Sequence, residues 1–99
     1  MTFFERFEAD ILSGKKVITI RDEAEKDYRP GAVVQVSTFE TGRWFCDLMI
    51  KSVAPIQFDE LSEFHANQEN MTLSELREVI RSIYPNANEL YVISYERVV

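Results

Sequence analysis

The fold is decided by residues 32–53, which read AVVQVSTFETGRWFCDLMIKSV. Two runs rich in β-branched and aromatic residues, 32–39 and 43–53, flank the dipeptide Thr41-Gly42, and this pattern is typical of a β-hairpin. Side chains alternate between the two faces of a strand, so every second residue of the later run shares a face. One of these faces consists of Trp44, Cys46, Leu48 and Ile50. Both faces are partly apolar, which favours a curled sheet that also receives helices.

On the N-terminal side of the hairpin, the sequence predicts one helix and one strand. Residues 2–5, Thr-Phe-Phe-Glu, have the spacing of a capping box, and Gly14 is suited to end a helix in the left-handed conformation. A helix is therefore expected over about residues 3–13. The β-branched run 17–21 predicts a strand, and residues 29–31, Arg-Pro-Gly, resemble a type II turn.

On the C-terminal side, two helices and a final strand are predicted. A short helix is expected from residue 59 to about residue 67. Residues 72–75 form a second capping box, and the helix that follows should end at Pro85. Residues 90–98 alternate as a strand does. The element order α, β, hairpin, α, α, β indicates an α+β fold with a curled, mostly antiparallel sheet, formed by residues 1–99 as a single domain.

Composition bears on the compartment and on bound metals. The one cysteine, Cys46, cannot close an internal disulfide, and the sequence has no Cys/His spacing typical of zinc sites. No apolar run approaches the roughly 20 residues that a membrane span needs. The opening residues MTFFERFEAD have neither the basic start nor the apolar stretch of a signal peptide. We therefore expect a cytoplasmic protein with no membrane partner and no metal.

The charge of the chain bears on its partners. Eleven Lys and Arg residues stand against seventeen Asp and Glu residues, and the net charge is −6. No basic cluster exceeds the pair Lys15-Lys16. Proteins hold long nucleic acids mainly by neutralising several phosphates, so this chain would repel such a polyanion. A neutral nucleoside meets no such repulsion, and the charge therefore favours a small-molecule substrate over long nucleic acid.

A first group of candidate functional residues lies in the segment 14–22, which reads GKKVITIRD. The ordinary interpretation is that the isoleucines pack while Lys16 and Arg21 are solvated. The functional interpretation is that the Thr19 hydroxyl acts as a nucleophile beside a base, because it cannot attack an amide unaided. Lys16 could be that base when neutral. A continuous strand would point Lys16 and Thr19 to opposite faces, so Lys16 must precede the strand, sit at a bulge or reach around the edge.

A second candidate group lies in residues 65–72, HANQENMT, before the capped helix. The ordinary interpretation is a surface loop in which His65 packs or caps a helix and Glu69 is solvated. The functional interpretation makes Glu69 a general acid that protonates the leaving nitrogen when an amide C–N bond breaks. The sequence pattern alone leaves both interpretations open.

These two segments carry a resemblance to a known family. Gly14, Lys16 and Arg21 match the glycine, lysine and arginine of the ASCH-domain motif G-x-K-x-x-E-x-R. Thr19 stands where most ASCH domains have glutamate, and this departure is characteristic of the N(4)-acetylcytidine amidohydrolase branch. Further stretches resemble that branch along essentially the whole chain: T-F-F-x-R-F, T-I-R-D-E, H-A-x-Q-E-N-M-T-L-S-E-L, I-Y-P and the final Y-V-I.

The resemblance implies a fold and an activity that composition does not. The fold would be the PUA-like (ASCH) curled β-barrel with packed helices. The activity would be hydrolysis of N(4)-acetylcytidine to cytidine and acetate without a metal or other cofactor. By motif position, Lys16 would be the proton acceptor, Thr19 the nucleophile and Glu69 the proton donor, while Arg21 would line the same cleft and bind substrate. Because they lie at a cleft, substitutions at Lys16, Thr19 and Glu69 are expected to melt near the temperature of the parent protein.

Three alternatives remain open at this point. In the first, Lys16 activates water directly and Thr19 only positions it. In the second, the chain is a non-catalytic PUA-like module that binds RNA or a modified nucleoside, since fold does not fix function. Such a module should carry a basic rim, which the acidic composition does not favour. In the third, the chain is a partner-binding domain without a small-molecule site.

Overall fold

The computed structural model describes residues 1–98. Its one sheet has the strand order β1-β3-β4-β5-β2, in which β1 runs parallel to β3 and all other neighbours are antiparallel. The strands are β1 (Thr2–Phe3), β2 (Ile18–Arg21), β3 (Val33–Thr38), β4 (Trp44–Gln57) and β5 (Glu89–Arg97). The predicted α+β class with a mostly antiparallel sheet is therefore confirmed.

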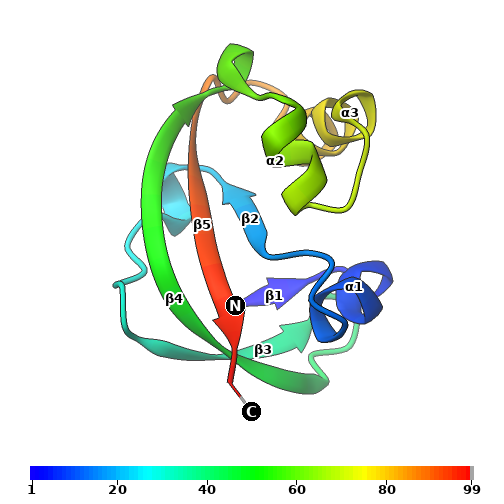
Figure 1. The fold of residues 1–99 in the computed structure, drawn as a ribbon, viewed down its shortest axis with the longest axis vertical. Helices are drawn as coiled ribbons and strands as arrows, with labels where there is room; N and C mark the ends of the chain where they lie inside the picture. Colours follow the sequence, from blue (N-terminus) through cyan, green and yellow to red (C-terminus); the bar gives the residue numbers. More distant parts are fainter. Residues whose placement is uncertain (99) are drawn as a thin grey trace.

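The curl of the sheet comes mainly from β4, which has 14 residues. Its first part pairs with β3 as far as Met49, and it pairs with β5 from Leu48 to Gln57. A register shift between Ile50 and Ser52 lies near the change of neighbour, and irregularities of this kind bend and twist a strand. Figure 1 shows β4 arching along the sheet, with the three α-helices on its concave side. The result is the expected PUA-like architecture, a curled half-barrel whose edge strands are β1 and β2.

The central hairpin forms as predicted, with two differences. β4 continues past the expected end at residue 53, through Pro55, to Gln57. Only β5 is its neighbour there, and proline is tolerated where a strand has one free edge. On the predicted apolar face, Cys46, Leu48 and Ile50 are buried, but Trp44 at the start of the strand is 55% exposed.

The type II turn before the hairpin is also confirmed. The backbone N–H of Ala32 donates to the carbonyl of Arg29 over 3.0 Å, and Gly31 has φ +89°. A positive φ at the third turn position is what glycine provides.

The predicted helix over residues 3–13 is wrong in its first half. Thr2–Phe3 forms β1, a short 3₁₀ helix follows at Glu5–Phe7, and α1 spans only Glu8–Leu12. The capping box does not form, because the Glu5 N–H donates to the carboxylate of Glu40 instead. Pairing with β3 therefore overrides the local helix signal in this segment. Gly14 does adopt the left-handed conformation expected after the helix, with φ +76°.

The predicted helix over residues 59–67 is divided in two. A 3₁₀ helix covers Phe58–Glu60, and α2 spans Glu63–Gln68. Leu61 between them is extended and buried, so the break places an apolar side chain in the core. The next helix, α3 (Leu73–Ile83), begins with the predicted capping box, in which the Glu75 N–H donates to Thr72 Oγ1.

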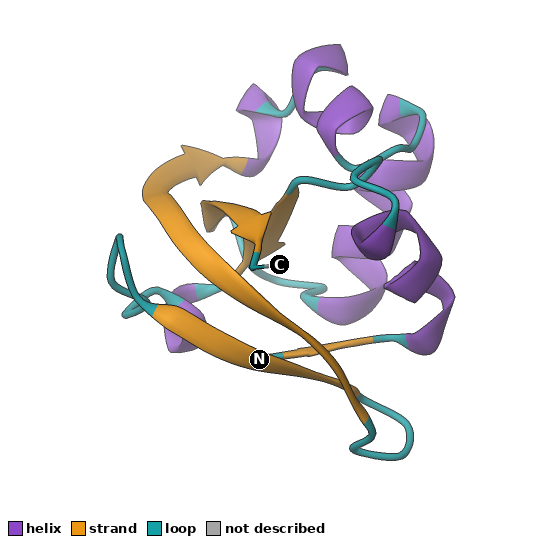
Figure 2. Cartoon of the chain, turned by 60° about the horizontal axis from the view of Figure 1, so that its bottom comes forward, coloured by secondary structure: helices purple, strands orange, loops and turns teal. Residues whose placement is uncertain are grey.

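Two hydrophobic clusters flank the space in which the site lies. One cluster joins β2 and β5 to α2 and α3, and includes Ile18 and Ile20. The other joins α1 to β1, β3 and β4, and includes Phe3 and Val36. Figure 2 shows the α-helices gathered on one side of the sheet, while the short 3₁₀ helix at Glu23–Glu25 lies apart from them. The N-terminal segment and α3 thereby come to lie on either side of β2, around the cavity described below.

Candidate active site

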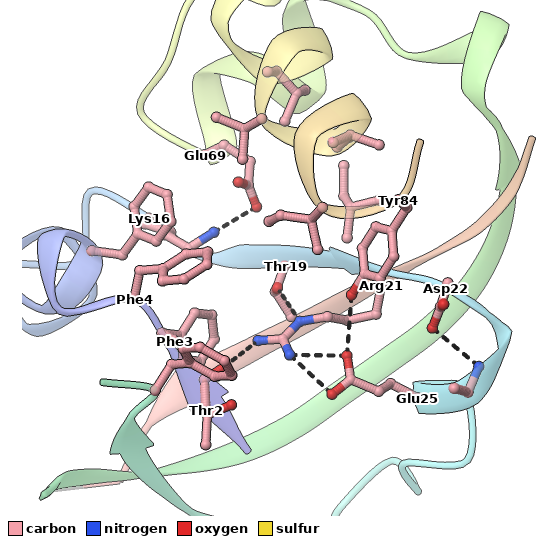
Figure 3. Close-up of a pocket in the computed structure, with 18 residues that line it drawn as sticks. Thr2, Phe3, Phe4, Lys16, Thr19, Arg21, Asp22, Glu25, Glu69 and Tyr84 are labelled. Carbon is pink, nitrogen blue, oxygen red and sulfur yellow. Dashed lines mark hydrogen bonds and ion pairs between the residues drawn. The ribbon is translucent and has the colours of Figure 1, made fainter. Parts of the chain in front are cut away.

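A cavity of about 380 Å³ lies between β2, the N-terminal segment and α3. This volume is within the range of small-molecule sites. Its polar part is lined by Lys16, Thr19, Arg21 and Glu69, the four residues that the sequence singles out. Figure 3 shows them around the cavity, with the N-terminal phenylalanines on one side and α3 on the other. The structure therefore brings together residues that are up to 53 positions apart in the chain.

Lys16 reaches the cavity because it precedes the strand proper. After α1 ends, the backbone N–H groups of Lys15 and Lys16 both donate to the carbonyl of Asp10, and Val17 N–H donates to Gln68 O. β2 begins only at Ile18, so the alternation of a strand does not govern Lys16. The side chain is 2% exposed, and its Nζ donates to Ile18 O over 2.8 Å and to Glu69 Oε1 over 2.6 Å. The interpretation of Lys16 as a solvated lysine is therefore wrong.

Glu69 sits at the C-terminal cap of α2, where its backbone N–H donates to the carbonyls of His65 and Ala66. Asn70 follows with φ +56° and ends the helix in the left-handed conformation. The side chain of Glu69 is 6% exposed and is paired with Lys16. The solvated-carboxylate interpretation is therefore wrong, whereas that of His65 as a capping residue is confirmed: its Nδ1 accepts from Ser62 N–H at the start of α2.

Burial sets the protonation behaviour of Lys16. Removal of water from the ammonium lowers the pKa of Lys16 below its ordinary value, and the pairing with Glu69 opposes this effect. The charge of Arg21 lowers the pKa of Lys16 further. A lysine with a lowered pKa is more readily present as the neutral amine, and only this form can act as a general base.

Thr19 and Arg21 lie on one face of β2, as the strand alternation predicts, and they contact each other. Arg21 Nε donates to Thr19 Oγ1 over 2.8 Å, and Nη2 donates to the carbonyl of Thr2 over 2.7 Å. Nη1 donates to both carboxylate oxygens of Glu25 over 3.2 and 3.0 Å. Thr19 is 4% and Arg21 9% exposed. Arg21 is therefore not solvated, and it holds the hydroxyl oxygen of Thr19.

Three residues of this network are not predicted as site residues from the sequence: Thr2, Glu25 and Tyr84. Thr2 is missed because β1 is not predicted. Glu25 lies four residues after Arg21, a spacing that suits an ion pair once a helical turn follows β2. Tyr84 donates its hydroxyl to Glu25 Oε2 over 3.3 Å, and burial raises the pKa of Tyr84 to about 12, so it remains a donor at neutral pH.

Within residues 1–98, no three His, Cys, Asp or Glu side chains are grouped so that they could hold a metal ion. In the same part of the chain, no helix has the length and apolar character that crossing a membrane requires.

The chain is similar in sequence to curated proteins over nearly its whole length. It is 69% identical to the N(4)-acetylcytidine amidohydrolase of Vibrio vulnificus over 98 residues, which cover 99% of this chain and 94% of the relative. It is 58% identical to the N(4)-acetylcytidine amidohydrolase of Shewanella baltica over 95 residues, which cover 96% of this chain and 90% of the relative. No protein-family model matches the chain.

Solved structures share the fold at low sequence identity. The ASCH domain from Lactobacillus crispatus superposes with a TM-score of 0.75 at 20% identity, and covers 91% of this chain and 69% of that one. The ASCH protein from Zymomonas mobilis superposes with a TM-score of 0.76 at 10% identity, and covers 98% of this chain and 67% of that one. These likenesses show the ASCH fold.

Proposed function

The chain belongs to the N(4)-acetylcytidine amidohydrolase family and is an amide hydrolase, and we propose that it cleaves the acetamide of N(4)-acetylcytidine to give cytidine and acetate. The observation that carries this proposal is the buried contact between Lys16 and Glu69 on the cavity that Thr19 also lines. A base, a hydroxyl and a proton donor are the groups that cleavage of an amide needs.

The proposed reaction starts with a proton transfer inside the ion pair. Lys16 Nζ donates to Glu69 Oε1 over 2.6 Å, and both side chains are almost fully buried. Desolvation disfavours separated charges, so movement of this proton to Glu69 is favoured more here than in water. It yields a neutral amine and a protonated carboxyl group, which are the two forms that the reaction requires. No proton has to enter from solution.

Acylation then restores the ion pair. Neutral Lys16 takes the proton of the Thr19 hydroxyl while Thr19 Oγ1 bonds to the acetyl carbon. The C–N bond breaks, and Glu69 gives its proton to the exocyclic nitrogen, so cytidine leaves with a complete amino group. The acetyl group remains as an ester on Thr19, Lys16 is an ammonium and Glu69 is a carboxylate.

Deacylation repeats the same proton movements with water as the nucleophile. After the proton shifts again from Lys16 to Glu69, the neutral amine takes a proton from water, which attacks the ester carbon. Glu69 gives its proton to the Thr19 oxygen as the ester bond breaks, which restores the ion pair, and the acetic acid released ionises to acetate in solution. In the alternative mechanism, Lys16 activates a water molecule that attacks the amide directly, and no ester forms on Thr19.

The cavity suits a neutral nucleoside. Its volume of about 380 Å³ accommodates a small molecule, and Phe3, Phe4 and Phe7 contribute an apolar aromatic wall. The net charge of −6 opposes long polyanions but not an uncharged ligand. A cytoplasmic location remains a prediction, in keeping with the free, buried thiol of Cys46.

The test is incubation of the purified protein with N(4)-acetylcytidine, followed by chromatography for cytidine and acetate. We expect both products in equal amounts, also after exhaustive dialysis against a chelator. Complete loss on dialysis with recovery on addition of zinc would contradict the site assignment. Binding without turnover would instead support the non-catalytic module.

A further inference from the structure

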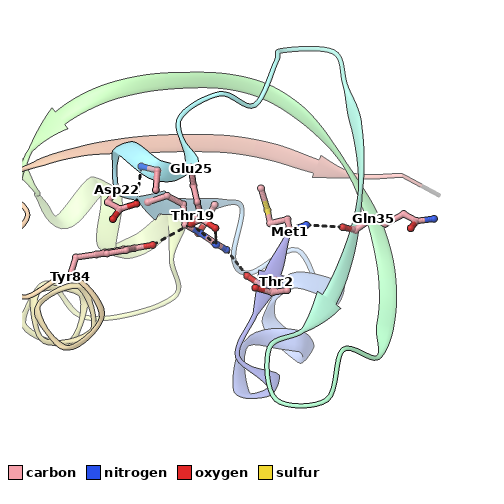
Figure 4. A network of polar contacts seen from close by, with 9 residues as sticks. Met1, Thr2, Thr19, Asp22, Glu25, Gln35 and Tyr84 are labelled. Carbon is pink, nitrogen blue, oxygen red and sulfur yellow. Dashed lines mark hydrogen bonds and ion pairs between the residues drawn. The ribbon is translucent and has the colours of Figure 1, made fainter.

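The Arg21 side chain belongs to a polar network that extends from Thr19 to Tyr84 at the end of α3. Figure 4 shows Thr19, Glu25 and Tyr84 of this network. Glu25 ends a 3₁₀ helix that follows β2, and Asp22 caps this helix by accepting from Ala24 N–H. The carboxylate of Glu25 receives Arg21 Nη1 on one side and the Tyr84 hydroxyl on the other. Glu25 is therefore fixed by groups from two separate elements of the fold.

The network leaves the guanidinium of Arg21 one orientation. Each of its three nitrogens donates to a different residue: Nε to Thr19, Nη1 to Glu25 and Nη2 to the carbonyl of Thr2. The ring of Phe3 lies over the guanidinium with its centroid 4.8 Å from Cζ. A planar fork held on every nitrogen can rotate only if several hydrogen bonds break together. The Nε–H group is thus aimed at Thr19 Oγ1.

This orientation has a consequence for the Thr19 hydroxyl. Its oxygen accepts from Arg21, so its own proton must point away from Arg21 and is free for another acceptor. When that proton leaves, the oxygen gains negative charge directly beside a permanent cation, which stabilises it. The same contact restricts the direction from which the oxygen can attack.

We propose that Glu25 is a positioning residue for the proposed hydrolysis: it orients Arg21 so that Nε–H holds Thr19 Oγ1 with its proton released toward the base. This inference rests on the proposed function, because it assigns Thr19 the reacting oxygen. Glu25 touches neither the reacting atoms nor Thr19 and acts only through Arg21. Tyr84 supports Glu25 through a single, longer hydrogen bond and has a smaller part.

The first test compares Glu25→Ala with Glu23→Ala. Both remove one carboxylate from the same 3₁₀ helix, but the Glu23 side chain is 78% exposed and pairs with Lys26. We expect kcat of Glu25→Ala to fall on the order of ten- to a hundredfold because the nucleophile is less well oriented, with little change in KM. Glu25→Gln retains one acceptor oxygen and should fall between Glu25→Ala and wild type. Glu23→Ala should match wild type. A wild-type kcat in Glu25→Ala would overturn the proposal.

The second test asks whether Glu25 acts through Arg21. In an Arg21→Ala background the residue to be oriented is gone, so adding Glu25→Ala should cause no further loss of kcat. A full additional loss would show that Glu25 acts by another route and would overturn the proposal. Thermal melting of each variant separates a loss of orientation from a loss of fold.

The third test does not depend on activity. The Nε–H resonance of Arg21 in ¹⁵N-resolved NMR spectra should exchange slowly with water in wild type and in Glu23→Ala, and rapidly in Glu25→Ala. Slow exchange in all three proteins would overturn the proposal. If wild type shows the expected NMR behaviour but does not hydrolyse N(4)-acetylcytidine, the proposed function fails while the orienting contact stands. If wild type is active and Glu25→Ala equally so, only the inference about Glu25 fails.

Discussion

Two cation–carboxylate pairs line the same cavity. They differ in the sequence separation of the partners, in their burial and in the geometry of the contact. Lys16 and Glu69 are 53 residues apart in the chain, and their side chains are 2% and 6% exposed. Arg21 and Glu25 are four residues apart, and their side chains are 10% and 34% exposed. Lys16 also contacts only one of the two oxygens of its partner, whereas Arg21 Nη1 contacts both.

Opposite charge alone therefore does not decide what an ion pair in this cavity can do. Guanidinium groups stay protonated throughout the physiological range, so the Arg21–Glu25 pair can hold and orient but cannot exchange its proton. Burial lowers the pKa of Lys16, and the proton of the Lys16–Glu69 pair has a short path between two desolvated groups. This difference supports the proposal that the buried pair transfers a proton and that the partly exposed pair orients the Thr19 hydroxyl.

The largest loss is expected when the Lys16–Glu69 pair can no longer transfer a proton. Lys16→Arg keeps the positive charge but removes the ability to act as a base near neutral pH. We expect kcat for N(4)-acetylcytidine to fall by at least about a hundredfold, as measured in steady-state assays.

Lys15→Arg is the matched control, because Lys15 is the exposed neighbour of Lys16 and the chemical change is the same. It should leave kcat unchanged. An unchanged kcat in Lys16→Arg would defeat the assignment of Lys16 as the base.

A comparable loss is expected for Thr19→Ala, which removes the hydroxyl but little volume. Thr19→Ser keeps the hydroxyl and the contact to Arg21, so it should retain part of the activity. If an ester forms on Thr19, rapid quenching of wild type with substrate should yield protein heavier by one acetyl group in mass spectrometry. Turnover retained by Thr19→Ala would favour direct attack by water that Lys16 activates.

A smaller and more selective loss is expected for Glu69→Gln, because losing the carboxylate that raises the pKa of Lys16 also favours the neutral amine, whereas the proton donor has no replacement. The amide has nearly the shape of the carboxyl group but has no acidic proton for the leaving nitrogen. We expect kcat to fall most for substrates whose amine is a poor leaving group, and least for acylated amines that leave readily. The measurement is a series of acyl amides with leaving groups of graded basicity. An equal loss across the series would contradict the role of Glu69 as proton donor.

Much of the fold follows from local signals in the sequence. The hairpin, the type II turn, the capping box of α3 and the alternation along β2 are all decided by residues close together in the chain, and all four are confirmed. The predictions are wrong where contacts with a distant segment of the chain determine the local structure. Thr2 and Phe3 become a strand because β3 lies beside them, although their local pattern favours a helix.

In the candidate site, too, local features are predicted correctly and contacts between distant segments are not. The shared face of Thr19 and Arg21 is a local property of a strand and is predicted correctly. The burial of Lys16 and Glu69 depends on how α2 docks beside β2, and the residue pattern alone favours solvated side chains. Tyr84 lies 59 residues from Glu25, and the spacing of residues gives no sign that they meet.

Burial also changes the expected cost of substitutions. Lys16 and Glu69 line the cavity, as expected of cleft residues, but both are almost fully buried, and from this burial we expect a substitution that removes one charge of the pair to lower stability. Lys16→Met leaves the carboxylate of Glu69 buried without its partner. We expect such a change to lower the free energy of unfolding by roughly 3–5 kcal/mol in urea titrations.

The smallest effect on stability is expected when both charges are removed together. In Lys16→Met/Glu69→Leu no charge is left buried without a partner, and apolar residues of similar volume commonly replace a buried ion pair at little cost.

The pH dependence of the free energy of unfolding tests the same pair in a second way. Because burial lowers the pKa of Lys16, the unfolded chain binds more protons than the folded one between that lowered pKa and 10.5, and the free energy of unfolding rises with pH in this window. The double variant should lose this rise in urea titrations at several pH values. A double variant as unstable as Lys16→Met would show that the ion pair stabilises the fold beyond balancing its own charges.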